Sequence, residues 1–174
     1  MKKEFQKRIL SSIILIPVAI FFIIKGSFLF NFFLLISLLV CIQEWHKMRN
    51  KKEFYVIGLF FLIFSFYSIY ALRNNFEGDY VWLLFITTIC VATDIGGYVF
   101  GKLFKGPKLT KFSPNKTYSG MIGGYFLSLI SANFFLQNLI VDINKDISTK
   151  IFIFVLLVSS ISQLGDIIIS YFKR

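Results

Sequence analysis

Long apolar runs recur along this sequence, and they constrain its fold more than any other feature. Each run approaches the roughly 20 residues that a helix needs to cross a bilayer, and 56% of the 174 residues are hydrophobic. The runs are continuous rather than alternating in polarity, which predicts helices rather than the strands of a barrel. We therefore expect an all-α, polytopic transmembrane helix bundle. Its six predicted spans cover residues 9–24, 27–45, 54–72, 80–99, 120–141 and 151–172.

The chain is expected to form one bundle rather than several domains. Residues 1–174 are thus predicted to be a single integral membrane domain. Three N-terminal spans occupy residues 1–72, where the sequence offers hydropathy and few motifs. Residues 80–174 contain the acidic, basic and glycine-rich motifs, so we expect the functional region there.

Basic residues exceed acidic ones, and the formal net charge is +10. They lie in short loops between apolar runs, which indicates membrane topology and anionic lipid headgroups rather than nucleic acid. If the N-terminus is cytoplasmic, fifteen of the nineteen lysines and arginines face the cytoplasm. The positive-inside rule therefore predicts a multi-pass membrane protein with both termini and the loop at residues 102–117 on the cytoplasmic side. We expect this membrane to be the plasma (inner) membrane.

Two of the nine acidic residues, Asp94 and Asp166, fall within predicted spans. A charged carboxylate at the centre of a membrane helix costs about 2.5–3.5 kcal/mol on insertion scales, so such residues are candidates for function. Both lie near the predicted cytoplasmic ends of their helices, where they can share a metal or a substrate. The alternative is that each accepts a hydrogen bond from a neighbouring helix.

The loop at residues 102–117 is a candidate phosphate site. Ser113 and Pro114 predict a turn, because proline fixes its own φ and pushes the preceding residue to an extended conformation. Lys116 and Thr117 then stand at the start of a helix, whose N–H groups and partial positive charge favour phosphate. Lysine is common in any cytoplasmic loop, and this one has five: Lys102, Lys105, Lys108, Lys111 and Lys116.

Glycines flank this loop on both sides. Their small size permits a ligand to approach the backbone closely, and small residues four apart also suit helix packing in membranes. The sequence leaves both roles open. The glycines are Gly97, Gly101, Gly120, Gly123 and Gly124.

The last predicted span has a polar face. Asp166, Ser170 and Lys173 are spaced i, i+4, i+7, which places them on one side of a helix. An acid, a hydroxyl and a lysine on one stripe are not typical of a lipid-facing surface. We therefore expect this face to point into the bundle.

At these residues the sequence resembles the phosphatidate cytidylyltransferases, also called CDP-diacylglycerol synthases. The block Ser113-Pro114-x-Lys116-Thr117-x-x-Gly120-x-x-Gly123-Gly124 matches the family pattern in full. Two further blocks match in part. Ile95 and Gly97 stand where the family usually has Thr and Ala, and Ile169 stands where it usually has Glu. These blocks are Asp94-x-x-x-Tyr98-x-x-Gly101 and Ser162-x-x-Gly165-Asp166 with Ser170-x-x-Lys173-Arg174.

The resemblance implies transfer of CMP from CTP to phosphatidate in phospholipid biosynthesis, giving CDP-diacylglycerol and pyrophosphate. It implies Mg²⁺ or another divalent cation, with Asp166 as a catalytic residue and metal ligand. It assigns Lys116 and Lys173 to catalysis, where they neutralise phosphate charge, and it implies a homodimer in the lipid bilayer. The substrate-binding residues that it implies are Ser113, Thr117, Gly120, Gly123, Gly124, Asp94, Ser170 and Arg174.

The family pattern continues past the position of Arg174 with a His-Gly-Gly turn and an Asp-Arg-x-Asp cluster. The resemblance implies that those acids complete the metal site, so we expect residues 1–174 alone to be inactive. Other interpretations stay open. A CTP-dependent membrane lipid kinase would release CDP instead of pyrophosphate, a small transporter would use Asp94 and Asp166 as an ion path, and a non-catalytic membrane remnant would do neither.

Overall fold

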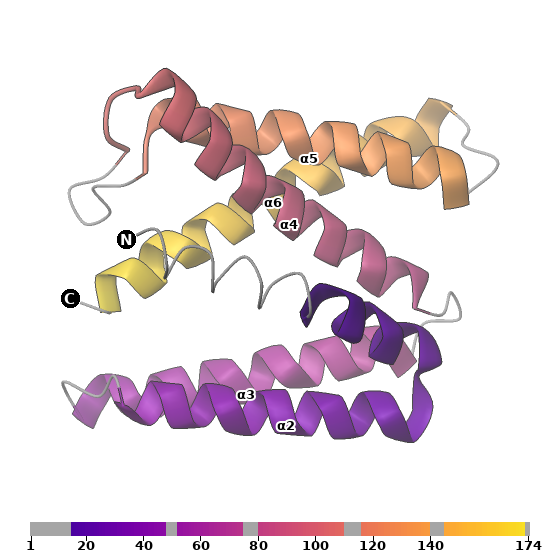
Figure 1. The fold of residues 1–174 in the computed structure, drawn as a ribbon, viewed down its shortest axis with the longest axis vertical. Coiled ribbons are helices and arrows are strands. Elements are labelled where there is room, and N and C mark those ends of the chain that lie inside the picture. Colours follow the sequence, from indigo (N-terminus) through magenta and orange to yellow (C-terminus); the bar gives the residue numbers. More distant parts are fainter. Residues whose placement is uncertain (1–14, 48–51, 75–79, 110–115, 140–144, 173–174) are drawn as a thin grey trace. The chain divides into compact units, whose positions relative to one another are not determined.

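The computed structural model describes residues 15–47, 52–74, 80–109, 116–139 and 145–172, and these are almost entirely helical (Figure 1). Five of the helices are long and apolar enough to cross a membrane, which confirms the predicted all-α, polytopic architecture. A shorter apolar helix, Leu15–Lys25, covers the described part of the first predicted span. The five long helices are α2 (Ser27–Lys47), α3 (Lys52–Asn74), α4 (Val81–Phe104), α5 (Tyr118–Leu139) and α6 (Lys145–Phe172).

Two helices extend five or six residues beyond the spans that hydropathy predicts. The predicted fourth span ends at residue 99 but α4 continues to Phe104, and the predicted sixth span begins at residue 151 but α6 begins at Lys145. Hydropathy marks the stretch that suits the bilayer core, whereas backbone hydrogen bonds continue through the polar flanks. The lysine loop is therefore shorter than predicted at its N-terminal end.

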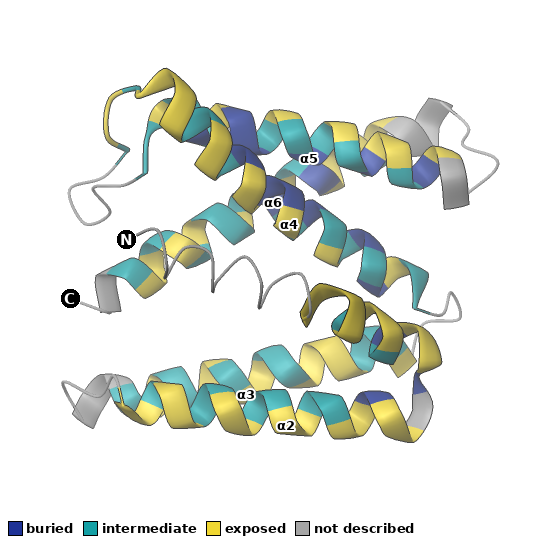
Figure 2. Cartoon of the chain, in the orientation of Figure 1, coloured by how far each residue is buried: buried dark blue, intermediate teal, exposed yellow. Residues whose placement is uncertain are grey.

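The chain divides into two compact units, Met1–Leu84 and Phe85–Arg174. In the first unit, α2 and α3 lie side by side as a helical hairpin (Figure 1). Gly26 connects the helix Leu15–Lys25 to α2 with a φ of 61°, a left-handed conformation that glycine adopts easily. Most apolar side chains of this unit are exposed or half-buried (Figure 2), as expected for helices that contact lipid.

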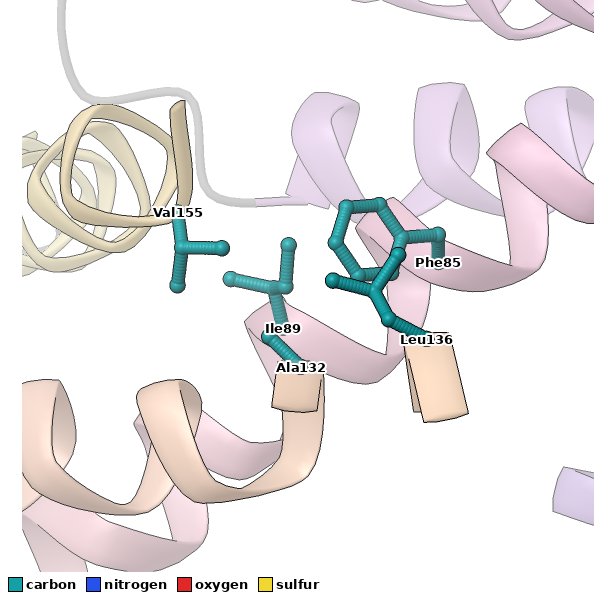
Figure 3. Close-up of a cluster of buried hydrophobic side chains, with 5 residues drawn as sticks. All are labelled: Phe85, Ile89, Ala132, Leu136 and Val155. Carbon is teal, nitrogen blue, oxygen red and sulfur yellow. The ribbon is translucent and has the colours of Figure 1, made fainter. Parts of the chain in front are cut away.

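The second unit consists of α4 from Phe85 onward, α5 and α6. Its apolar core takes side chains from all three helices, and these converge in Figure 3. The residues are Phe85 and Ile89 of α4, Ala132 and Leu136 of α5, and Val155 of α6.

Glycines bring the backbones of α4 and α5 into contact. A Cβ atom on Gly96 would overlap the Gly123 carbonyl group, and one on Gly120 would lie 2.6 Å from the Gly97 carbonyl oxygen. This is the close approach that small residues permit between membrane helices. It places the N-terminal end of α5 against the part of α4 that follows Asp94.

Candidate functional site

The described ends of the lysine loop are joined by backbone hydrogen bonds. Leu109 N–H donates to the Lys116 carbonyl at 2.8 Å, and Tyr118 N–H donates to the Pro107 carbonyl at 3.0 Å. Directly after α4, Lys105 has a left-handed conformation with a φ of 43°. The loop therefore returns on itself and fixes Lys116 directly before α5.

Thr117 caps the N-terminus of α5. Its side-chain oxygen accepts a hydrogen bond from Gly120 N–H at 3.1 Å, and its carbonyl accepts one from Met121 N–H at 3.0 Å. The Tyr118 N–H is already bonded to Pro107. Three of the first four N–H groups of α5 are thus satisfied within the protein, so any affinity for phosphate at this end depends mainly on Lys116 and the helix dipole.

Lys116 and Asp166 form the central ion pair of the site. Lys116 Nζ lies 2.6 Å from Asp166 Oδ2, although the two residues are fifty positions apart. Their side chains are 28% and 49% exposed, so an incoming ligand can reach both. The ion pair thus brings together the motif of the lysine loop and the motif of the last span, which are far apart in the sequence.

A cavity of about 230 Å³ contains this ion pair. Asp94 of α4 lines the same cavity, as do Thr117 and Gly120 from the start of α5. The structure therefore brings together five of the predicted site residues: Asp94, Lys116, Thr117, Gly120 and Asp166.

The other predicted residues lie elsewhere or outside the described residues. A Cβ atom on Gly123 would overlap the Phe100 ring, and one on Gly124 would lie 3.0 Å from the Thr93 carbonyl oxygen, so both glycines serve helix packing in this structure. Ser170 lies on α6, and it is not among the residues that line the cavity in the described part of the chain. The remaining three, Ser113, Lys173 and Arg174, fall outside the described residues.

Sequence reasoning did not identify Gln163, which lines the cavity and donates to the Met121 carbonyl at 3.3 Å. A neutral amide on an apolar helix attracts less notice than an acid. A signal was nevertheless present, because Ser159, Gln163 and Asp166 are spaced i, i+4, i+7 and share one face of α6.

The two carboxylates suit a divalent cation only in combination with a substrate. Asp94 and Asp166 supply oxygen atoms to one cavity, and hard cations prefer oxygen ligands. Within the described ranges no group of three or more His, Cys, Asp or Glu side chains is close enough to hold a metal alone. The residues therefore fit a cation whose remaining ligands come from phosphate oxygens or water.

Residues 52–174 match the Cytidylyltransferase family. A phosphatidate cytidylyltransferase of Rickettsia conorii is 31% identical over 181 residues, which cover 99% of this chain and 77% of that protein. One of Brucella suis is 31% identical over 137 residues, which cover 78% of this chain and 48% of that protein. No solved structure matches the chain.

Proposed function

Since this chain belongs to the cytidylyltransferase family, we infer that it acts in the transfer of CMP from CTP to phosphatidate, with CDP-diacylglycerol and pyrophosphate as products. The observation that carries the proposal is the Lys116–Asp166 ion pair, which shares a cavity with Asp94 at the N-terminal end of α5. The names of the relatives in Rickettsia and Brucella support this choice of substrates.

The reaction is a displacement at phosphorus. An oxygen of the phosphatidate phosphate forms a bond to the α-phosphorus of CTP, and the bond from that phosphorus to the bridging oxygen of the β-phosphate breaks. Pyrophosphate leaves with that electron pair. Such reactions depend mainly on positioning and on stabilisation of charge, so the chain needs cationic groups where the phosphate charge develops.

Lys116 supplies such a group in this proposal. Its ammonium already lies at the cavity and is partly exposed, so it can contact a phosphate oxygen without leaving the site. Asp166 and Asp94 would hold a divalent cation together with the phosphates. When bound, that cation would neutralise further charge on the phosphate oxygens.

We also propose that the site lies on the cytoplasmic side of the plasma membrane. The distribution of basic residues supports this orientation, since CTP is cytoplasmic and fifteen basic residues fall in the predicted cytoplasmic segments. It also includes a homodimer, for which the family resemblance is the support. Ser113, Lys173 and Arg174 are proposed as further phosphate contacts, and Ser170 as a polar contact on α6.

The test uses a chimaera in which residues 1–174 replace the matched region of the Rickettsia conorii relative. Membranes that contain the chimaera are incubated with phosphatidate and CTP labelled at the α-phosphate, and the 174-residue chain is assayed beside it. We expect the chimaera to give labelled CDP-diacylglycerol and pyrophosphate. CDP release with labelled nucleotide left in solution would identify a lipid kinase instead, and no turnover by a well-folded chimaera would contradict the proposal.

A further inference from the structure

Gln163 joins α6 to α5 at the edge of the cavity. Its side-chain N–H donates to the Met121 carbonyl at 3.3 Å, and the residue is half-buried. Gly124 makes room for this contact, because a Cβ atom there would lie 3.0 Å from Gln163 Nε2. The Gln163 amide on α6 and the absence of a side chain at Gly124 on α5 thus both favour close packing of these two helices.

The contact between Gln163 and Met121 lies close to the Lys116–Asp166 ion pair in the sequence of both α6 and α5. Gln163 precedes Asp166 by three residues, so the two side chains are neighbours on one face of α6. Met121 lies just after the cap at Thr117, on the segment that begins with Lys116. A shift of α6 along α5 at Gln163 therefore moves the Asp166 carboxylate relative to the Lys116 ammonium.

A second hydrogen bond fixes α6 on the same face. The Thr93 hydroxyl of α4 is hydrogen-bonded to the Ser159 hydroxyl at 2.9 Å, and both residues are fully buried. On this face of α6, Ser159 thus contacts α4, Gln163 contacts α5, and Asp166 contacts Lys116. The bond at Ser159 is buried, whereas Gln163 and Asp166 line the cavity.

We propose that Gln163 is a positioning residue, which sets the place of Asp166 opposite Lys116 by binding the Met121 carbonyl. This role rests on the proposed cytidylyltransferase activity, because that activity uses the ion pair. Gln163 itself need not contact the reacting atoms.

Ser160 provides a matched control. Its side chain is 2.8 Å from the Tyr125 hydroxyl, so it also forms a side-chain hydrogen bond between α5 and α6, but neither residue lines the cavity. Gln163→Met keeps the length of the side chain and removes the donor. Ser160→Ala removes the control bond.

The first measurement is kinetic and uses the chimaera. A small misplacement of reacting groups can cost up to about 10²-fold in rate, so we expect Gln163→Met to lower kcat on the order of 10-fold with little change in KM for CTP. Ser160→Ala should keep kcat. Equal losses in the two variants, in step with equal losses of thermal stability, would overturn the positioning role.

The second measurement does not require activity. Lys116→Cys and Asp166→Cys are introduced into a chain that carries Cys41→Ala and Cys90→Ala, and a short bifunctional thiol reagent then joins the two positions. We expect Gln163→Met to lower the yield of this cross-link several-fold, while Ser160→Ala leaves it unchanged. An unchanged yield with Gln163→Met would overturn the inference, even if the chimaera is an active cytidylyltransferase. A reduced yield without any cytidylyl transfer would instead contradict the proposed function alone.

Discussion

The two units of this chain differ in how their serine and threonine hydroxyls are bonded. In the hairpin of α2 and α3, serine hydroxyls bond to the backbone of their own helix: Ser37 to the Phe33 carbonyl and Ser65 to the Phe61 carbonyl. In the second unit, Thr93 of α4 and Ser160 of α6 also bond to their own backbone, but each has a partner on another helix as well: Ser159 of α6 for Thr93 and Tyr125 of α5 for Ser160. Thr93 and Ser160 therefore join two helices of the second unit, whereas Ser37 and Ser65 bond only within their own helices.

The two units also differ in their ion pairs. Glu44 and Lys47 are one turn apart on α2, 2.8 Å from each other and well exposed, which is a common and weak surface arrangement. Lys116 and Asp166 are fifty residues apart and join two segments inside a cavity. Because the tertiary fold brings Lys116 and Asp166 together in a cavity, this second pair is a candidate for a catalytic role.

The largest expected effect comes from neutralising one carboxylate in each pair. Asp166→Asn should lower CDP-diacylglycerol formation by the chimaera at least about 10²- to 10³-fold, the usual loss for a group that stabilises a transition state. Glu44→Gln should leave the rate unchanged, since its partner is an exposed lysine on the same helix. Both variants are assayed with labelled CTP at equal membrane content. Wild-type turnover in Asp166→Asn would show that the Lys116–Asp166 pair of the second unit is not part of the active site.

Glycine substitutions give the next largest effect. Gly96→Ala introduces a methyl group that overlaps the Gly123 carbonyl of α5, and such overpacking typically costs about 1–3 kcal/mol. Gly165→Ala is the control, because nothing lies within 4 Å of the position that its Cβ would occupy. Thermal unfolding in detergent should show a lower Tm for Gly96→Ala and an equal or higher Tm for Gly165→Ala. The opposite order would show that α4 and α5 are not in close contact at these glycines.

The sequence predicted the helical architecture well because a bilayer permits few alternatives. Apolar runs of sufficient length must form helices, and α2, α3 and α5 lie within a few residues of their predicted spans. It also selected Asp94, Lys116 and Asp166, because a charge in or beside a membrane span demands an explanation.

The interactions between helices could not be predicted in the same way. Hydropathy does not reveal that Lys116 contacts Asp166, that Thr117 uses its hydroxyl as a helix cap, or that Gly123 packs against Phe100. Each depends on the rotation and register of one helix against another. Gln163 was missed for the same reason, since its importance follows from the Met121 carbonyl that it contacts.

The smallest expected effect tests the difference between hydroxyls directly. Thr93→Val keeps the shape of the side chain and removes two bonds, one to the Ile89 carbonyl within α4 and one to Ser159 of α6. Ser65→Ala removes a bond of the first kind alone, within α3. Hydrogen bonds between membrane helices contribute about 0.6 kcal/mol on average and up to about 1.7 kcal/mol, and the buried Ser159 hydroxyl would lose this partner. Thr93→Val should therefore lower the Tm measurably and Ser65→Ala should not. Equal Tm values would mean that the polar contacts of the second unit fix the register of its helices without adding to its stability.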